Sequence, residues 1–166
     1  MSVAEVMSME NVSSPARTGS GVPIEIDGVS KQYKAARGGA VQALDMVDLS
    51  IRAGEFVSIV GPSGCGKSTL MMLVSGLIPR SSGTIRVGGT VVNGPVQQAG
   101  IVFQRDVLLD WRSVLANVLL PVEIKGLDKQ THLAKARALL RSVGLGEFED
   151  KYPAELSGGM RQRAAI

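Results

Sequence analysis

The feature that most constrains this chain is a glycine-rich segment near its middle, residues 61–69. Its sequence, GPSGCGKST, fits the pattern G-x-x-x-x-G-K-[ST] of a phosphate-binding loop. Residues 55–60, just before it, form a short and mostly apolar run typical of a buried parallel strand. Residues 67–75 carry apolar side chains at helical spacing, and Gly76 is the predicted end of that helix. Strand, glycine loop and helix in this order are the context that the motif requires.

The residue types of this loop suit the chemistry of phosphate groups. Its glycines allow backbone conformations in which N–H groups point at an anion, and the helix adds its positive end. Lys67 is expected to reach the β- and γ-phosphates, Ser68 to bind Mg²⁺ through its hydroxyl, and Thr69 to bond a phosphate nearer the sugar. A surface turn rich in Gly and Ser is the alternative, which the matching flanks disfavour. The predicted nucleotide-binding residues are Gly61, Ser63, Gly64, Cys65, Gly66, Lys67, Ser68 and Thr69.

The composition is that of a globular protein. The 166 residues suffice for one domain with a core. A net charge of only +3, with 4% aromatic residues and no dense Lys/Arg cluster, disfavours nucleic-acid binding. No apolar run approaches membrane-spanning length. Cys65 is the single cysteine, so an internal disulfide is excluded. It is either a small filler residue or part of a redox-sensitive nucleotide site.

The order of the predicted elements divides the chain into three parts. Residues 1–23 lack periodicity and are predicted to be a disordered tail. Residues 24–104 are predicted to form a nucleotide-binding α/β core with a small antiparallel sheet, and residues 105–166 a helical subdomain. The strands expected are 24–33, 41–44, 47–51, 55–60, 84–87, 90–92 and 99–103, with a turn at 34–40. The later helices expected are 114–124, disturbed by Pro121, and 128–143, closed by Gly144.

Several residues outside the loop have more than one interpretation. Tyr33 either stacks on an adenine ring or packs at the end of a strand. Gln104 follows a predicted strand, where open α/β sheets bind ligands, or is an exposed loop residue. Asp110 ends an apolar run similar to a Mg²⁺-binding strand, but Trp111 follows where a catalytic acid is expected, so we interpret this run as a loop. His132 is predicted to be exposed and non-catalytic.

A second motif, LSGGMRQR at residues 156–163, predicts another helix start. Ser157 is the predicted cap, and Gly158 and Gly159 expose backbone N–H groups near the positive helix end. A Ser-Gly-Gly turn before a helix is common by itself. Its pairing with the phosphate-binding loop favours a second anion-binding helix terminus.

With both motifs present, residues 24–166 resemble the ATP-binding subunits of ABC transporters. The resemblance implies an α/β fold: a P-loop NTPase core with an antiparallel β subdomain and a helical subdomain, incomplete at the C-terminus. ATP and Mg²⁺ are the implied ligands. The implied contacts are adenine stacking by Tyr33, phosphate binding by the Walker A residues 61–69, Mg²⁺ and attacking-water contacts by Gln104, and contact of Ser157, Gly158 and Gly159 with ATP held by a second subunit.

Shorter segments resemble the nitrate/sulfonate/taurine importer branch of this family. They include residues 102–104 and 109–111, and the signature motif in which Met160 replaces the family's usual Gln. The resemblance implies ATP hydrolysis that powers import. The implied partners are a second ATP-binding subunit, transmembrane permease subunits and, indirectly, a periplasmic solute-binding protein. The implied location is the cytoplasmic face of the inner membrane, with peripheral attachment.

The chain departs from the family where it ends, inside the helix that follows the signature. The Walker B aspartate, the catalytic glutamate and the switch histidine of the family have no counterpart here. We therefore expect a fragment of a longer ATPase that binds nucleotide without turning it over and that is marginally stable alone. The alternatives are an inactive half-cassette that pairs with a complete one and a non-transport ABC ATPase. The signature argues against a P-loop kinase or GTPase.

Overall fold

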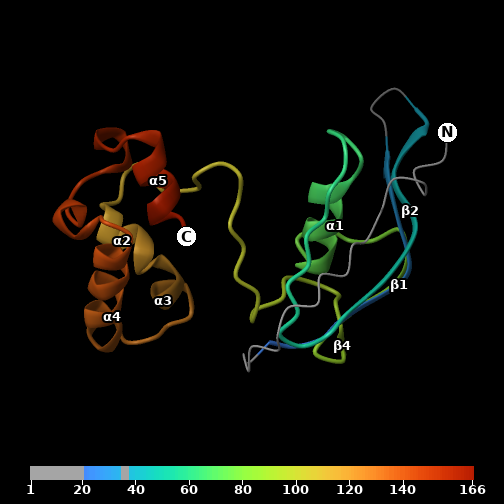
Figure 1. Cartoon of the computed structure of the whole chain (residues 1–166), viewed down its shortest axis with the longest axis horizontal. Helices are drawn as coiled ribbons and strands as arrows, with labels where there is room; N and C mark the ends of the chain where they lie inside the picture. Colours follow the sequence, from blue (N-terminus) through green and yellow to red (C-terminus); the bar gives the residue numbers. More distant parts are fainter. Residues whose placement is uncertain (1–20, 35–37) are drawn as a thin grey trace. The chain divides into compact units, whose positions relative to one another are not determined.

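The structure is a computed structural model that describes residues 21–34 and 38–166. The predicted tail lies outside the described residues up to residue 20, and so do residues 35–37 of the predicted turn. The chain divides into two compact units, Met1–Ala99 and Gly100–Ile166, which we describe one at a time (Figure 1).

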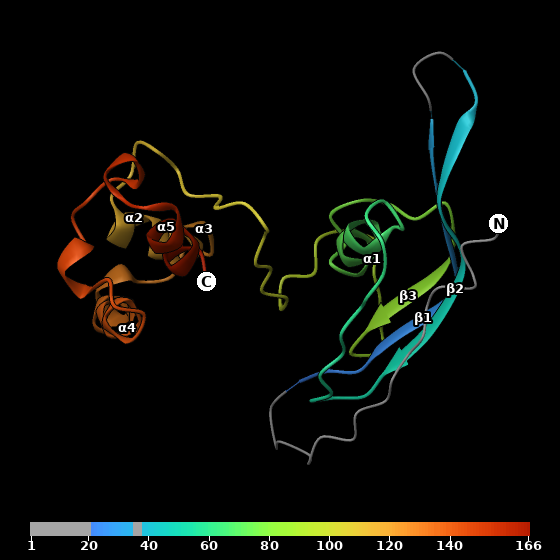
Figure 2. The ribbon, with the colours of Figure 1, turned by 45° about the horizontal axis from the view of Figure 1, so that its top comes forward.

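The first unit contains a four-stranded antiparallel sheet in the order β2-β1-β3-β4. The central strand β1 pairs with β2 on one side and with β3 on the other (Figure 2). The strands are β1 Ile24–Lys34, β2 Ala40–Ile51, β3 Ser82–Val87 and β4 Thr90–Val91. The antiparallel subdomain predicted from the sequence is confirmed. The two short strands expected at 41–44 and 47–51 form one strand, in which Met46 adopts a φ of 48° and donates its N–H to Ser30 Oγ.

The helix α1, Lys67–Val74, packs against this sheet and closes the core of the first unit. Leu70 and Leu73 are almost fully buried, whereas Leu77, which has the same helical spacing as Leu70 and Val74, is 44% exposed beyond the end of the helix. Gly76 has a φ of 72° just beyond the helix, which confirms the predicted end. The sheet contributes buried side chains to the same core: Ile26, Val29, Leu44 and Ile85.

Two predicted strands, residues 55–60 and 99–103, are wrong. The structure leaves both segments outside any strand, and the side chains of Phe56 and Val60 are 87% and 75% exposed. A parallel strand exists only through hydrogen bonds to a neighbour, and in the described part of the chain every strand pairing is antiparallel. The strands at 55–60 and 99–103 were predicted from apolar composition alone, and in the described structure neither segment pairs with another strand.

The second unit is helical. Its helices are α2 Val114–Val118, α3 Leu120–Ile124, α4 Lys129–Ser142 and α5 Gly158–Ala164, with 3₁₀ turns at Gly146–Phe148 and Pro153–Glu155. Pro121 has no N–H to continue α2, so the predicted helix over 114–124 divides into two. The Asp128 carboxylate accepts hydrogen bonds from the N–H groups of Gln130 and Thr131, and Gly144 adopts a φ of 73° beyond α4. The predicted helix over 128–143 is confirmed.

The core of the second unit is small and apolar. It consists of four almost fully buried side chains from different parts of the unit: Val114, Leu140, Leu145 and Leu156. Leu156 belongs to the second motif, so this motif is attached to the core of its unit. Among the described residues, no helix combines the length and the apolar character needed to cross a bilayer.

Candidate nucleotide-binding site

The glycine-rich loop leads directly into α1 and rests against β2. Gly64 and Gly66 have φ values of 83° and 96°, in the left-handed region that favours glycine. A Cβ atom at Gly66 would lie 2.7 Å from the carbonyl oxygen of Ala43 and 2.7 Å from Leu44 Cδ2. Gly66 is therefore required twice, for its backbone conformation and for the close approach of the loop to the sheet.

The Lys67 ammonium folds back over this loop. Its Nζ donates hydrogen bonds of 2.7 Å to the carbonyl oxygens of Gly61 and Pro62, and it lies 3.6 Å from Cys65 Sγ. These acceptors are neutral, whereas a phosphate oxygen is anionic and adds charge–charge attraction to its hydrogen bond with the ammonium. An incoming phosphate group is therefore a stronger acceptor than the carbonyls that the ammonium contacts.

Ser68 and Thr69 follow at the first turn of α1. Ser68 is exposed, so its hydroxyl is open to an incoming metal ion, and Thr69 is half-buried. Cys65 is also half-buried, and a Cβ atom at Gly61 would lie 2.7 Å from its Sγ. The Cys65 thiol thus occupies the space that a side chain at position 61 would enter, which fits the interpretation of Cys65 as a filler residue.

The structure relates Tyr33 to the loop through paired strands. Tyr33 lies near the end of β1, two residues from Lys31, which pairs with Leu44 of β2. Leu44 is the residue that approaches Gly66. The Tyr33 side chain is 39% exposed, and Lys31 Nζ lies 5.0 Å from its ring centroid, a cation–π arrangement. The ring is thus accessible beside the strand that supports the loop.

The loop residues fit a nucleotide polyphosphate and its metal. The site offers glycine N–H groups, an ammonium group whose partners are carbonyls, and an exposed hydroxyl of the kind that Mg²⁺ binds. In the described ranges there is no group of three or more His, Cys, Asp or Glu side chains arranged to hold a metal ion. The metal ligands predicted from the sequence, Ser68 and Gln104, are not His, Cys, Asp or Glu, so the absence of such a group does not bear on them.

The second motif forms the helix start that its sequence predicts. Ser157 Oγ accepts a hydrogen bond from the N–H of Met160 at 3.3 Å, and α5 follows. Gly158 and Gly159 are exposed, and a Cβ atom on either would meet no atom nearer than 3.9 Å. Gln104 is exposed in an irregular segment. Gln104 and the second motif belong to the second unit, so their approach to a nucleotide held by the first unit remains a prediction.

The sequence analysis did not predict the ion pairs that stabilise the second unit. Arg161 pairs with Asp106, and Glu123 forms ion pairs with both Arg112 and Lys129. The hydrogen bonds from Arg112 and then from Lys129 lower the pKa of the Glu123 carboxyl to about 2. The opposite charges were visible in the sequence, but spacings such as 55 residues between Asp106 and Arg161 gave no signal that they meet.

Comparisons with known proteins show the family to which this chain is similar. Residues 44–166 match the ABC transporter family. The taurine import ATP-binding protein of Rhizobium johnstonii is 45% identical over 143 residues, which are 86% of this chain and 55% of that protein. An ABC transporter ATP-binding protein of Methanocaldococcus jannaschii is 41% identical over 145 residues, 87% of this chain and 54% of that protein. A dimeric bacterial ABC transporter cassette of known structure has a TM-score of 0.78 at 33% identity, covering 86% of this chain and 67% of that one.

The chain therefore belongs to the ABC transporter family of ATP-binding proteins. The taurine import ATP-binding protein of Escherichia coli, 41% identical over 77% of this chain and 50% of that protein, adds to the likeness. These relatives confirm the resemblance to the taurine, nitrate and sulfonate branch. The predicted α/β fold class is confirmed as well. The chain spans about half the length of the curated relatives it matches.

Proposed function

We propose that this chain is the nucleotide-binding part of an importer ATPase. It binds ATP with Mg²⁺ and, with a second ATP-binding subunit, powers permease subunits that import taurine, nitrate, sulfonate or a similar small solute. The observation that carries the proposal is the loop itself, in which Gly66 closes against β2 and the Lys67 ammonium lies over the loop carbonyls. The names of the relatives support the importer class and the solute class.

Each predicted residue has a role in this proposal. Bound ATP supplies the phosphoanhydride bond whose cleavage powers transport. Lys67 leaves its carbonyl partners and holds the β- and γ-phosphates, while Ser68 holds the metal and Thr69 a phosphate nearer the sugar. Tyr33 offers its accessible ring to the adenine, and Gln104 contacts the metal and the attacking water. The N–H groups of Gly64, Cys65 and Gly66 surround the phosphate oxygens.

Hydrolysis requires more than nucleotide binding. A group must position the attacking water, and an acidic side chain must support the metal. We assign neither role to Asp110 or His132: the His132 ring nitrogen Nδ1 lies 2.8 Å from the carbonyl oxygen of Asp128 at the start of α4. We therefore propose that this chain alone binds nucleotide without turning it over. The alternative of an inactive half-cassette paired with a complete one predicts the same binding.

The proposed partners follow from the second motif. Ser157, Gly158 and Gly159 contact ATP held by a second ATP-binding subunit, so that two subunits enclose two nucleotides. The solved ABC transporter cassette to which this chain is similar is dimeric, which supports a dimer. The remaining partners are permease subunits and, through them, a periplasmic solute-binding protein. The proposed location is peripheral, at the cytoplasmic face of the inner membrane.

The test is a nucleotide-binding titration with the Lys67→Ala variant. We expect a fluorescent ATP analogue with Mg²⁺ to bind the unmodified chain and to bind Lys67→Ala about 100-fold more weakly, because a charge-assisted phosphate contact is lost. Lys135→Ala, which removes an exposed lysine of α4, is the matched control and should bind normally. Equal binding by Lys67→Ala and by the unmodified chain would contradict the proposed site.

A further inference from the structure

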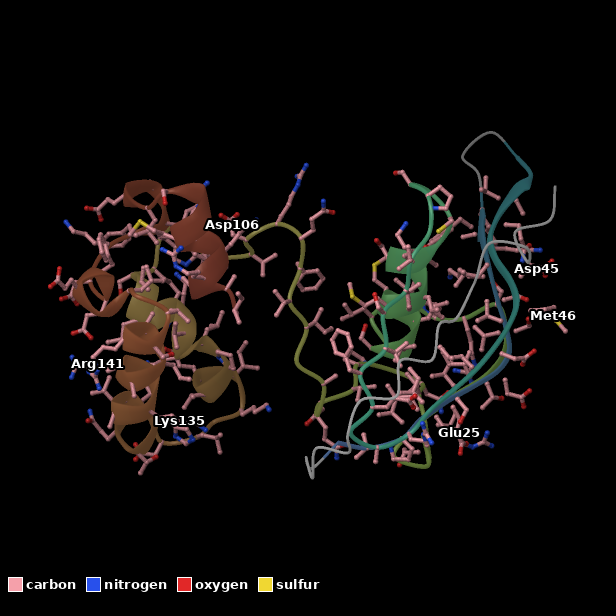
Figure 3. All side chains as sticks on the ribbon, in the orientation of Figure 1. Glu25, Asp45, Met46, Asp106, Lys135 and Arg141 are labelled. Carbon is pink, nitrogen blue, oxygen red and sulfur yellow. The ribbon has the colours of Figure 1, made fainter. Side chains whose placement is uncertain are left out.

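One ion pair of the second unit joins its two predicted nucleotide-contacting segments. Arg161, in α5, donates from Nε to Asp106 Oδ2 at 2.5 Å and from Nη1 to the carbonyl oxygen of Leu156 at 2.9 Å. Asp106 lies two residues beyond Gln104, and Leu156 immediately precedes the cap residue Ser157. Figure 3 shows Asp106 at the end of the irregular segment, beside α5. A single guanidinium group therefore holds the Gln104 segment and the start of the signature helix together.

The two ends of this contact differ in rigidity. Leu156 is 5% exposed and belongs to the apolar core of the unit, so its carbonyl is a fixed point. Asp106 lies in residues 100–108, which have no regular secondary structure. In the described part of the chain, no other hydrogen bond holds these residues. Arg161 is therefore the tie between an irregular segment and a packed helix.

The surroundings of the Asp106–Arg161 ion pair indicate that it stabilises the contact between the two segments. The side chains of Arg161 and Asp106 are 36% and 29% exposed, so the pair is partly shielded from water. Partial burial strengthens the attraction relative to an ion pair in open solvent, and the second donor of Arg161 fixes the guanidinium plane. Holding the plane beforehand lowers the entropy cost of forming the pair.

We propose that Asp106 and Arg161 are positioning residues that couple the two nucleotide sites of the dimer. This inference rests on the proposed function, in which Gln104 contacts the nucleotide of its own subunit and residues 157–159 contact that of the partner. A shift of the Gln104 segment toward its own nucleotide displaces Asp106, and Arg161 transmits the displacement to the carbonyl that precedes Ser157. Coupling between sites is reciprocal, so the partner's nucleotide also biases the Gln104 segment.

A second ion pair of the same unit provides the matched control. Arg137 of α4 donates two hydrogen bonds to Glu149, at 2.9 and 3.0 Å, with side chains that are 44% and 25% exposed. Its charge and exposure resemble those of the Asp106–Arg161 pair, in which the two side chains share a single hydrogen bond. It attaches α4 to the segment after Gly146–Phe148 and touches neither motif. The Arg137→Gln variant therefore shows the effect of losing an ion pair that touches neither motif.

The experiment measures two binding steps in the full chain. The variants are Asp106→Asn, Arg161→Gln, the charge exchange Asp106→Arg with Arg161→Asp, and the control Arg137→Gln. A fluorescent ATP analogue is expected to bind all of them within about twofold of the unmodified chain, since the phosphate-binding loop is untouched. Dimerisation driven by ATP and Mg²⁺, measured by analytical ultracentrifugation, is expected to weaken about tenfold in the two single variants. It is expected to recover partly in the charge exchange and to stay unchanged in the control.

Hydrogen exchange of the nucleotide-free chain gives a readout that does not depend on a dimer. Amides of residues 157–160 should exchange faster in Asp106→Asn and Arg161→Gln than in Arg137→Gln. Unchanged exchange, or unchanged dimerisation of single variants that bind the analogue normally, would overturn the positioning role and leave the proposed function standing. An unmodified chain that fails to bind the analogue at all would overturn the proposed function and this inference with it.

Discussion

The two motif helices of this protein both begin at glycines, but the glycines meet different needs. Gly66, before α1, has a φ of 96° and lies so close to β2 that a Cβ atom would be 2.7 Å from a carbonyl oxygen. Gly158, at the start of α5, has open surroundings, since its Cβ atom would meet Arg161 Nη2 at 3.9 Å and nothing nearer. The fold of the chain therefore requires glycine at the first position and not at the second.

The difference separates structural from functional glycines. A glycine that its own fold requires says little about ligands, because the close contact already explains it. A glycine in open space has no such internal explanation, and at Gly158 and Gly159 the empty surroundings leave room for a group from outside the chain. This comparison supports the proposal that the second motif contacts a nucleotide held by a partner. Substitutions at Gly66 and Gly158 test the comparison directly, and their expected effects on the free energy of unfolding are the largest and the smallest of those that follow.

The largest effect is expected for Gly66→Ala. The substitution forces a side chain into a left-handed conformation and into the backbone of β2, and we expect a loss of about 3 kcal/mol of unfolding free energy. Gly64→Ala is the matched control, because its φ of 83° carries the backbone cost alone, about 1 kcal/mol, with no atom within 4 Å of the new Cβ. Urea unfolding measures both. Equal losses would show that the approach to β2 does not matter.

A loss of about 2 kcal/mol is expected for Asn117→Ala in the second unit. The buried Asn117 amide accepts from the Leu109 N–H at 2.8 Å and donates to the carbonyl oxygens of Leu109, Arg112 and Ser113. Its removal takes the amide partner from the Leu109 N–H and the Arg112 carbonyl, while the Leu109 and Ser113 carbonyls keep the backbone N–H groups of Arg112 and Asn117. Urea unfolding followed by far-UV circular dichroism measures the loss. Asn93→Ala, at an exposed amide of the first unit, should change stability little; a comparable loss there would contradict the explanation.

A smaller, pH-dependent effect is expected for Glu123→Gln. The ion pairs hold the folded pKa of Glu123 near 2, below its ordinary value of 4.5. A depressed carboxyl pKa adds stability that is fully present above pH 4.5 and is lost as the pH falls through 4.5 toward 2. The variant should therefore show a flatter dependence of the urea midpoint on pH in this window. Glu147→Gln, at an exposed carboxyl outside the ion pairs of the described residues, should keep the slope of the unmodified chain.

The contrast between the two glycine sites also shows what sequence alone can predict. The loop, the helix after it and the Ser157 cap follow from local rules, because each depends on residues a few positions apart. The antiparallel strands were predicted from their composition and turns, although Ile24 of β1 pairs with the distant Val87 of β3. The strands expected at 55–60 and 99–103 depend on a neighbour in space, and their composition carries no information about that neighbour.

Side-chain contacts across long separations escaped prediction for the same reason. The Lys67 contacts with the loop carbonyls lie within six residues, and its contact with the β- and γ-phosphates stays a prediction. Asp106 and Arg161 meet across 55 residues, and the close approach of Gly66 to β2 spans more than 20, so only the folded chain shows them. The predicted roles of Gln104 and of the second motif concern a bound nucleotide, and they remain predictions that the experiments address.

The smallest effect on stability is expected for Gly158→Ala, which completes the comparison. Alanine is the better helix former and fits the open space, so unfolding free energy should rise by up to about 1 kcal/mol or stay unchanged. If the open space serves a partner's nucleotide, the added methyl group should still weaken ATP-driven dimerisation, measured by analytical ultracentrifugation, while binding of the ATP analogue to the phosphate-binding loop persists. A variant that dimerises normally would mean that nothing from outside approaches Gly158, and the functional explanation of this glycine would have to be abandoned.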